Sequence, residues 1–534
     1  MPYSPPIGIP TPPFGIDQVN PTMPSPWTTN LAGFYYVAAG GTNAGNGFPT
    51  SPRGSIPTTI ADGEVCFVER GGTFNVTSGV TWTINGTLGS PAWILAAPGA
   101  GARPLFKAPT TTESDSDLDF SGTFFIIDNL QFSNKTLNFG NATTDFGFRN
   151  NEVKDVNAVT NNFGAAIGMS SVRGVYYNND IHENGQWQSG VEWDVHGFKG
   201  SPGGDTNWIL DSRIFHCGGD AIQLGDATEP EPWCRNTFIG RNDMYENREN
   251  AVDLKKCRRT IVSQNKMHNH VPVDTSAGDA CVVHDSGEDV WIIFNDIYSN
   301  HNDVGSTGFT GFYAIGNIIR NNLGSPTAGS FFGNGIGGYI RASSSIFFLE
   351  NTFVGIPKFL SAPQSGSAAV VTQGNIFVDG GTDFHIGYGT TGAAGACTLR
   401  HNLSRVTPLI RASSTTYSGF AAFDAAFPAA IVDNNVTADP IFVNQAGGDF
   451  HLQSSSPARD ANVTTPHAAY TTFETQFPTA GSIKKDWDGN LRPVPGTAWD
   501  IGAFEFGSGP VPPPVGVLPT GSGRGPNKVK YGRF

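Results

Sequence analysis

Three segments near the middle of the chain repeat one pattern of acidic, apolar and basic residues: Asp220–Asp226, Asn250–Lys256 and Asp279–Asp285. Successive side chains along a strand point to opposite faces, so the apolar positions of each segment are expected inside. The intervening positions, with one residue from the preceding segment, are expected on one outer face: Lys199, Gln223, Asp253, Lys255 and His284. One edge of this face is expected to hold His196, Asp220, Asn250 and Asp279, and the other edge Asp226, Lys256 and Asp285.

These residue types suit proton transfer beside a negative charge. A lysine with a lowered pKa can act as a base, and we expect Lys255 in that role, with His284 as its partner or as the alternative base. Lys199 and Asp253 complete the expected catalytic set. Carboxylate oxygens are the ligands that Ca²⁺ prefers, so Ca²⁺ is the expected cofactor. The expected ligands are Asp220, Asp226, Asp253 and Asp279.

Two other interpretations of the same residues stay open. Hydrolysis needs two carboxylates about 5 to 9.5 Å apart, which Asp253 could form with Asp220 or with Asp279. Alternatively, the charged residues form ion pairs on a solvated face and have no catalytic role. Asp220, Asn250 and Asp279 would then only bend the chain into the strand.

Substrate contacts are expected from Trp233, Gln223 and Lys256. Trp233 ends the acidic loop Glu229–Trp233 and is expected to be exposed, where a sugar ring could stack on it. Trp208 and Trp291 begin apolar runs and are expected in the core.

A recurrent asparagine, usually followed one residue later by a hydrophobe, predicts the elements that position these side chains. It recurs every 22 to 34 residues from Asn151 to Asn402, with Ser212 taking the position once. The full series is Asn151, Asn179, Ser212, Asn242, Asn265, Asn295, Asn317, Asn351, Asn375 and Asn402. A repeat of this length, built from short strands, is typical of a solenoid.

Each repeat contains short runs rich in Val, Ile, Phe and Tyr, such as Val175–Tyr177 and Trp291–Phe294. Such runs favour strands, and no long helical pattern separates them. Coils whose strands pair with those of the next coil, about 4.8 Å away, satisfy this pattern. We expect the asparagine to occupy a left-handed bend and to hydrogen-bond to its counterpart in the next coil. The predicted fold is an all-β, right-handed parallel β-helix.

Composition narrows the range of partners. The formal net charge of −14 disfavours nucleic acid or an anionic membrane surface. A local basic groove would still admit an acidic polysaccharide. No apolar stretch of about 18 residues is present, so we expect no membrane insertion.

Three regions are predicted: a Pro-rich extension over residues 1–33, the β-helix over residues 34–506 and a Gly/Pro-rich tail over residues 507–534. The first residues lack the features of a secretory signal. The expected location is nevertheless extracellular, on the cell surface or in a virion. The basic, aromatic tip of the tail is either disordered or docks on a neighbouring subunit, so both ends are candidate contacts for a homo-oligomer.

Two cysteines lie eight residues before ladder asparagines, in the matching segments Cys234–Ile239 and Cys257–Val262. They are expected to stack in adjacent coils, about 5 Å apart. That spacing suits either a disulfide or two buried thiols.

The chain resembles secreted right-handed parallel β-helix proteins of the pectate-lyase-like group over residues 34–506. The resemblance rests on Tyr35–Val37 and Asp62–Phe74 at the start and on Asp439–Val443, Gly448–Leu452, Ser456–Asp460, Asp486–Asn490 and Asp500–Phe506 at the end. It implies the fold without fixing one activity, because the group contains polysaccharide lyases, hydrolases, epimerases, tailspikes and non-catalytic surface proteins.

In lyases of this group, carboxylates on one outer sheet hold Ca²⁺ near a lysine or arginine, which the residues around Lys255 resemble in kind. The expected function is recognition of an extracellular polysaccharide, with β-elimination on an acidic glycan. The competing expectation is a non-catalytic structural or adhesive subunit of a virion, filament or cell surface. A tailspike that also degrades a glycan would combine the two.

Overall fold

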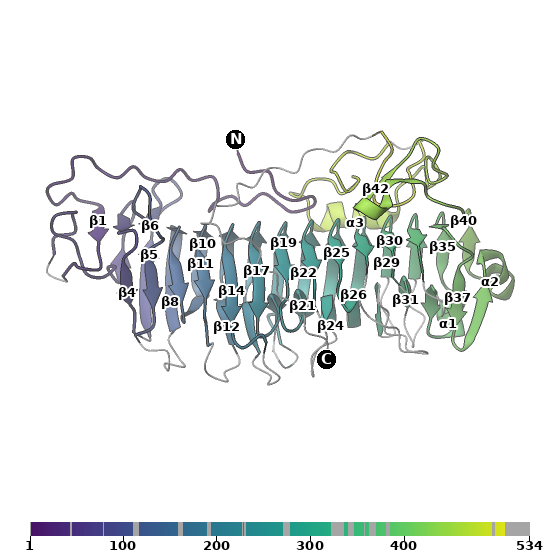
Figure 1. Cartoon of the computed structure of the whole chain (residues 1–534), viewed down its shortest axis with the longest axis horizontal. Helices are drawn as coiled ribbons and strands as arrows, with labels where there is room; N and C mark the ends of the chain where they lie inside the picture. The colour runs from purple at the N-terminus through teal and green to yellow at the C-terminus, as the bar shows by residue number, and fades with distance from the viewer. Residues whose placement is uncertain are drawn as a thin grey trace.

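The computed structural model describes residues 2–507, except for residues 43–44, 78, 110–116, 158–163, 189–193, 227, 229–230, 271–277, 322–335, 340–345, 357, 363–369, 381–384 and 494–496. The predicted tail over residues 507–534 therefore lies outside the described part from residue 508 onward. The chain winds into a long parallel β-helix whose coils stack along the horizontal axis of Figure 1. With the right-handed crossovers that parallel strands require, this is the predicted right-handed solenoid.

Three columns of parallel strands form the walls of the solenoid, and each coil contributes one strand to each column. The first face contains β1 (Phe34–Val37), β3 (Val65–Val68), β6 (Ala92–Ala96), β8 (Asp117–Asp128), β10 (Thr136–Arg149), β13 (Val172–Tyr177), β16 (Asp205–Leu210), β19 (Cys234–Gly240), β22 (Cys257–Ser263), β24 (Asp279–Ile293), β26 (Asn302–Ile315), β29 (Ile346–Leu349), β32 (Val370–Gln373), β35 (Thr398–Arg400) and β39 (Ile431–Asp433).

The long strands β8, β10, β24 and β26 bend at a corner and continue into the second face. The other strands of that face are β2 (Thr59–Ile60), β5 (Val80–Asn85), β12 (Gly164–Met169), β15 (Val195–Gly200), β18 (Ile222–Leu224), β21 (Val252–Lys255), β28 (Ile336–Tyr339), β31 (Leu360–Ala362), β34 (Ile386–Tyr388), β37 (Leu409–Ala412) and the antiparallel β38 (Thr415–Ser418).

The third face is a separate sheet of short strands. It contains β4 (Thr73–Asn75), β7 (Leu105–Lys107), β9 (Gln131–Ser133), β11 (Glu152–Lys154), β14 (Asp180–Asn184), β17 (Arg213–Cys217), β20 (Asp243–Tyr245), β23 (Lys266–His268), β25 (Asp296–Tyr298), β27 (Ile318–Arg320), β30 (Thr352–Val354), β33 (Ile376–Val378), β36 (Leu403–Ser404) and β40 (Val436–Thr437).

The few helices lie in the C-terminal third. They are α1 (Thr391–Gly395), α2 (Phe420–Ala426) and α3 (Ala468–Gln476). A short hairpin of β41 (Phe442–Asn444), the 3₁₀ turn η1 (Gln445–Gly447) and β42 (Asp449–Leu452) belongs with α3 to a segment that lies along the side of the solenoid in its C-terminal half and that we call the cap (Figure 1). Within the described residues, no helix is both long and apolar enough to cross a membrane.

The predicted asparagine ladder is confirmed at the corner between the first and third faces. The backbone N–H of each ladder residue donates to the side-chain oxygen of the next, as in Asn295 to Asn317 at 3.0 Å and Asn317 to Asn351 at 3.0 Å. The ladder extends one coil beyond the prediction, since Asn402 donates to Asn435 at 3.0 Å. The side-chain amides also donate to carbonyl oxygens of the first face, which satisfies polar groups inside the corner.

One detail of the corner was predicted wrongly. The left-handed residue is not the ladder asparagine but the residue before it, including Arg241 at φ 50° and Phe294 at φ 55°. The side-chain amide of the asparagine bridges neighbouring coils, whereas the left-handed bend lies at the residue that precedes it.

The predicted stacking of Cys234 on Cys257 is confirmed as a register pair of β19 and β22. All six cysteines are buried thiols rather than disulfides. Cys234 donates to the carbonyl oxygen of Ser201 at 3.0 Å, so the structure supports the thiol alternative.

The N-terminal extension lies on the outer side of the first face as an ordered strap (Figure 1, purple trace). Trp208 Nε1 donates to the Pro10 carbonyl at 2.8 Å, and Ser263 Oγ donates to the Ile7 carbonyl at 2.6 Å. Trp208 and Trp291 are buried as predicted. They lie in a hydrophobic cluster on the outer side of the first face, with Ile7 and Ile9 of the strap, and not in the lumen of the solenoid. The extension expected to contact neighbouring subunits therefore packs on its own chain.

Candidate functional site

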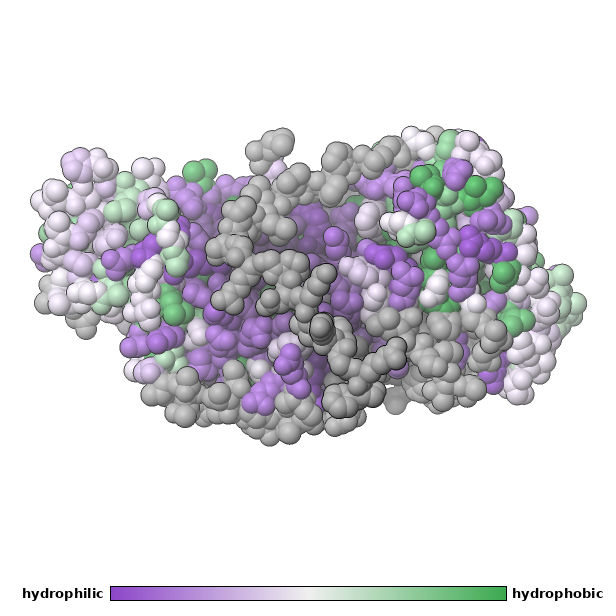
Figure 2. All heavy atoms as spheres, in the orientation of Figure 1, coloured by the Kyte–Doolittle hydropathy of each residue, from purple (hydrophilic) through white to green (hydrophobic). Residues whose placement is uncertain are grey.

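The central part of the second face contains most of the predicted site residues. The predicted register is confirmed: Gln223 pairs with Asp253, Val252 with Cys281, and Lys255 with His284. Lys199 from β15 is the register partner of Gln223. In Figure 2, the coloured residues that are visible between the grey ones in the middle of the view are mostly hydrophilic, while hydrophobic residues are more frequent toward the two ends.

Two predicted members of this face are shielded from solvent. Gln223 is 4% exposed and Asp253 is 5% exposed. The core itself is filled by their neighbours Ile222, Leu224 and Val252. The Gln223 Oε1 atom is buried without a hydrogen-bond partner. The prediction of a fully solvent-facing row is therefore wrong at these two positions. The alternation of side chains along a strand determines on which face of the sheet a side chain lies, but it does not determine whether other residues cover that side chain.

Lys255 is an ion-paired cation. Its Nζ lies 2.9 Å from Asp253 Oδ2. Burial alone would lower the pKa of Lys255, but the Asp253 carboxylate, with Asp220 and Asp194 further away, raises this pKa above its ordinary value. The expectation of a lysine with a lowered pKa is not met, so Lys255 suits neutralisation of a substrate carboxylate better than proton abstraction.

Lys199 and Asp226 form a second, more exposed pair at the far edge of this face. Lys199 Nζ lies 3.7 Å from Asp226 Oδ2, and their side chains are 30% and 45% exposed. A hydrogen bond from the Thr228 amide lowers the pKa of Asp226, and the Lys199 ammonium acts in the same direction. The Asp226 carboxylate therefore remains charged at neutral pH.

The edge column predicted as His196, Asp220, Asn250 and Asp279 is a second buried ladder. The amide of Asp220 donates to His196 Nδ1 at 3.0 Å, that of Asn250 donates to Asp220 Oδ1 at 3.1 Å, and that of Asp279 donates to Asn250 Oδ1 at 3.0 Å. Burial, reinforced by the negative charge of Asp253, raises the pKa of Asp220. These contacts give Asp220 and Asp279 a structural role, in which each links its coil to a neighbouring coil.

The structure does not bring the four predicted calcium ligands together. Asp220 and Asp226 lie at opposite ends of β18, and Asp220 is 0% exposed. The carboxylate pairs considered for hydrolysis are likewise enclosed, because Asp253 and Asp279 are 5% and 9% exposed. A different group meets instead at the start of the second face: Asp194, His196 and Glu249.

The remaining predicted residues lie around this face. Trp233 is half-buried, with the Arg258 guanidinium 4.6 Å from its ring centroid, so one face of the expected sugar platform is already covered. Lys256 is half-buried at a left-handed turn between β21 and β22. His284 occupies its predicted register position in β24, but its side chain lies outside the described residues.

Two cavities lie away from this face, where the cap meets the third face, and a third lies within the cap region. Their volumes are about 590, 240 and 270 Å³. The first two are lined by Arg320, Phe450 and the hairpin residues Gly447 and Gly448, and His451 lines the second and the third. These cavities were not predicted from the sequence, because each forms between segments that are separated in the chain.

Comparison with known proteins adds fold-level similarity only. No protein-family model and no curated protein sequence matches the chain. Among solved structures, the pectate lyase Pel9A is 14% identical with a TM-score of 0.41, over 88% of this chain and 96% of that one. An alginate lyase from Paenibacillus sp. str. FPU-7 is 14% identical with a TM-score of 0.38, over 54% of this chain and 97% of that one. The Streptococcus pneumoniae surface protein and adhesin PfbA is 13% identical with a TM-score of 0.34, over 60% and 91% of the two chains.

Proposed function

We propose that this β-helix protein binds an acidic polysaccharide on the outer side of the second face and cleaves it by β-elimination. The observation that carries the proposal is the Lys255 ammonium, held 2.9 Å from Asp253 and still 19% exposed at its side chain. Lys199 supplies a second cation on the same face, two coils earlier. Acidic polysaccharides of this kind lie outside cells, so we place the protein there, either secreted or on a virion.

Elimination requires the carboxylate beside the reacting carbon to be neutralised. The ammonium of Lys255 is charged at neutral pH and suits this role. A base then removes the proton beside the carboxylate, a carbon–carbon double bond forms, and the bond to the leaving oxygen breaks as that oxygen gains a proton. His284, the register neighbour of Lys255, is the candidate base, since an imidazole titrates near neutral pH.

The test separates a charge role for Lys255 from a base role. Absorbance near 235 nm follows the unsaturated product with a panel of uronate-containing polysaccharides, with and without Ca²⁺. We expect Lys255→Arg to retain a measurable fraction of the activity and Lys255→Met to lose about 100-fold or more. Lys266→Met, at an exposed lysine of β23 on the third face, serves as the control and should lose little.

Equal loss in both Lys255 variants would contradict the charge role and restore the base role. No 235 nm product from any polymer would contradict the elimination. The runner-up is a non-catalytic structural or adhesive protein, favoured by the internal ion pairs Lys255–Asp253 and Lys199–Asp226. A glycan-binding signal without a cleaved product would assign this second function.

A further inference from the structure

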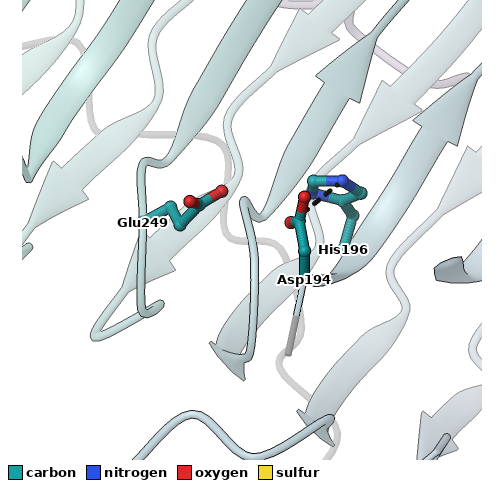
Figure 3. Close-up of side chains that lie close together, drawn as sticks. All are labelled: Asp194, His196 and Glu249. Atoms are coloured by element: carbon teal, nitrogen blue, oxygen red, sulfur yellow. Dashed lines mark ion pairs between the residues drawn. The ribbon is translucent and has the colours of Figure 1, made fainter. Parts of the chain in front are cut away.

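Three side chains from two different coils direct their ligand atoms into one space at the start of the second face (Figure 3). These are Asp194, just before β15, His196 within β15 and Glu249, just before β21. One nitrogen or oxygen atom from each lies within 4.8 Å of the others. His196 Nε2 lies 3.2 Å from Asp194 Oδ1.

A glycine in the coil between them keeps this space open. Gly219 donates its N–H to the Val195 carbonyl at 3.0 Å and accepts from the Glu249 amide at 3.4 Å, so it lies between the two ligand-bearing coils. A Cβ atom at Gly219 would lie 2.2 Å from Asp194 Oδ1 and 2.7 Å from His196 Nδ1. Any side chain there would fill the space in which the three groups converge.

A buried hydrogen-bond acceptor, the Asp220 carboxylate, lies beside the imidazole of His196. Asp220 is 0% exposed, and its Oδ1 accepts from the amide and the side chain of Asn250 at 3.1 and 2.9 Å. Its Oδ2 is buried, has no hydrogen-bond partner and lies 3.3 Å from His196 Nδ1. A histidine that binds a metal through one nitrogen commonly donates the other N–H to a carboxylate. Ligation through Nε2 would let Nδ1–H donate to Asp220 Oδ2.

The same nitrogen also lies 3.0 Å from the Asp220 amide, which donates to it while Nδ1 is unprotonated. That state places the proton on Nε2, toward Asp194. Metal binding would replace the proton on Nε2 and select the other tautomer, in which Asp220 Oδ2 gains its missing donor. In that tautomer the Asp220 amide loses Nδ1 as its acceptor, so the loaded state requires a small local movement of the imidazole or of the Asp220 backbone.

We propose that Asp194, His196 and Glu249 form a binding site for Zn²⁺, with Asp220 as the positioning residue for His196. Two carboxylates balance the two positive charges of the ion. An imidazole ligand favours zinc over Ca²⁺, which takes oxygen ligands. The site differs in residues and in metal from the all-carboxylate calcium site expected from the sequence. Asp194 and Glu249 are half-buried, so further coordination positions can face solvent or a ligand.

A second buried histidine supplies a matched control. His270 also occupies a ladder, where its N–H donates to Asn300 Oδ1 at 3.1 Å and its Nε2 lies 3.3 Å from Asn247 Nδ2. Its ring nitrogens contact amide groups, while those of His196 lie beside carboxylates. His196→Asn and His270→Asn each retain a ladder acceptor, but only the first removes a proposed ligand.

The experiment is calorimetric titration of the chelator-treated full chain with ZnCl₂ and, separately, with CaCl₂. Circular dichroism and thermal melts establish that each variant is folded. We expect one Zn²⁺ per chain, bound more tightly than Ca²⁺, and a visible absorption spectrum when Co²⁺ replaces Zn²⁺. His196→Asn and Glu249→Gln should abolish or strongly weaken binding, and Asp220→Asn should weaken it about 10- to 100-fold. His270→Asn should bind as the wild type does.

The proposal is overturned if the wild type binds no Zn²⁺, if Ca²⁺ binds as tightly, or if His196→Asn leaves the affinity unchanged. Because the readout is metal binding, a failure here is distinct from a failure of the polysaccharide proposal.

Discussion

At the scale of single residues, buried amides set the register of this chain. Each ladder asparagine accepts from the amide of the preceding coil and donates into the first face, so one side chain satisfies polar groups in several coils. Asn317 is 0% exposed and donates to the Ile292 carbonyl at 2.8 Å. Truncation of the side chain would leave these buried backbone groups without hydrogen-bond partners. A buried polar group without a partner destabilises the folded state, because it has lost its contact with water.

Asn317→Ala should therefore lower the free energy of unfolding by about 2 to 3 kcal/mol, through buried groups left without partners. The measurement is urea denaturation followed by circular dichroism. Asn178→Gly is the control: Asn178 is half-buried at φ 53°, a conformation that glycine adopts without strain. A similar loss in both variants would show that the ladder position has no special role.

The sequence predicted the register of the site residues because like residues stack on like in a parallel solenoid. It could not predict the protonation of Lys255, which depends on an ion pair formed by two side chains of one strand and on carboxylates from neighbouring coils. Glu249 was missed because a single acidic residue in a turn carries no pattern. Gly219 was missed because its importance lies in the space that it leaves between Asp194 and His196.

At the scale of elements, the third face carries a column of stacked rings on its outer side. The ring centroids of His182, Phe215, Tyr245, His268 and Tyr298 follow one another at 4.9, 4.9, 5.2 and 4.6 Å. The Arg320 guanidinium closes the column 4.1 Å from Tyr298 and also lines the cavities under the cap. The spacing follows the rise of the coils, so these rings stabilise neighbouring strands of the third face against one another.

The cap is held by a histidine between two carboxylates. His451 in β42 lies 2.6 Å from Asp449 through Nδ1 and 2.6 Å from Asp488 through Nε2. The hydrogen bond to Asp488, with that to Asp449, raises the pKa of His451 to about 9 against the opposing effect of burial. This contact joins the hairpin to the turn that follows α3.

The stability of the cap should depend on pH through this histidine. The pKa of His451 is raised in the folded state, so protonated His451 stabilises that state. This stabilisation is fully present below the ordinary pKa of about 6.5 and is lost as pH rises through about 9. We expect the melting temperature to fall over this window and the fall to be smaller in His451→Gln. His401→Gln, whose ring contacts the Ala461 carbonyl, is the control and should keep the wild-type slope. An unchanged slope in His451→Gln would contradict the assignment.

At the scale of the whole molecule, the N-terminal strap and the cap region meet over the middle of the solenoid. A solenoid is stabilised by contacts within repeats and between neighbouring repeats, so distant coils are coupled only through the coils between them. Here the strap crosses several coils: Tyr3 donates to Asp211 at 2.6 Å, and the Ile7 amide donates to Gln264 at 2.9 Å. At Gly8 the strap closes against Ile293, and against Phe473 and Ile483 of the cap region.

This arrangement predicts that the strap makes unfolding cooperative across the coils it crosses. Ile9 is 1% exposed and packs over Gly240, so Ile9→Ala should cost about 2 to 4 kcal/mol by leaving a cavity. The same variant should increase hydrogen exchange in β16, β19 and β22 together, because all three lose the cover that joins them. Val19, at 88% exposed, provides the matched control in Val19→Ala, which should change neither quantity. Faster exchange confined to β19, the strand that contains Gly240, would mean that the strap covers each coil separately and does not couple them.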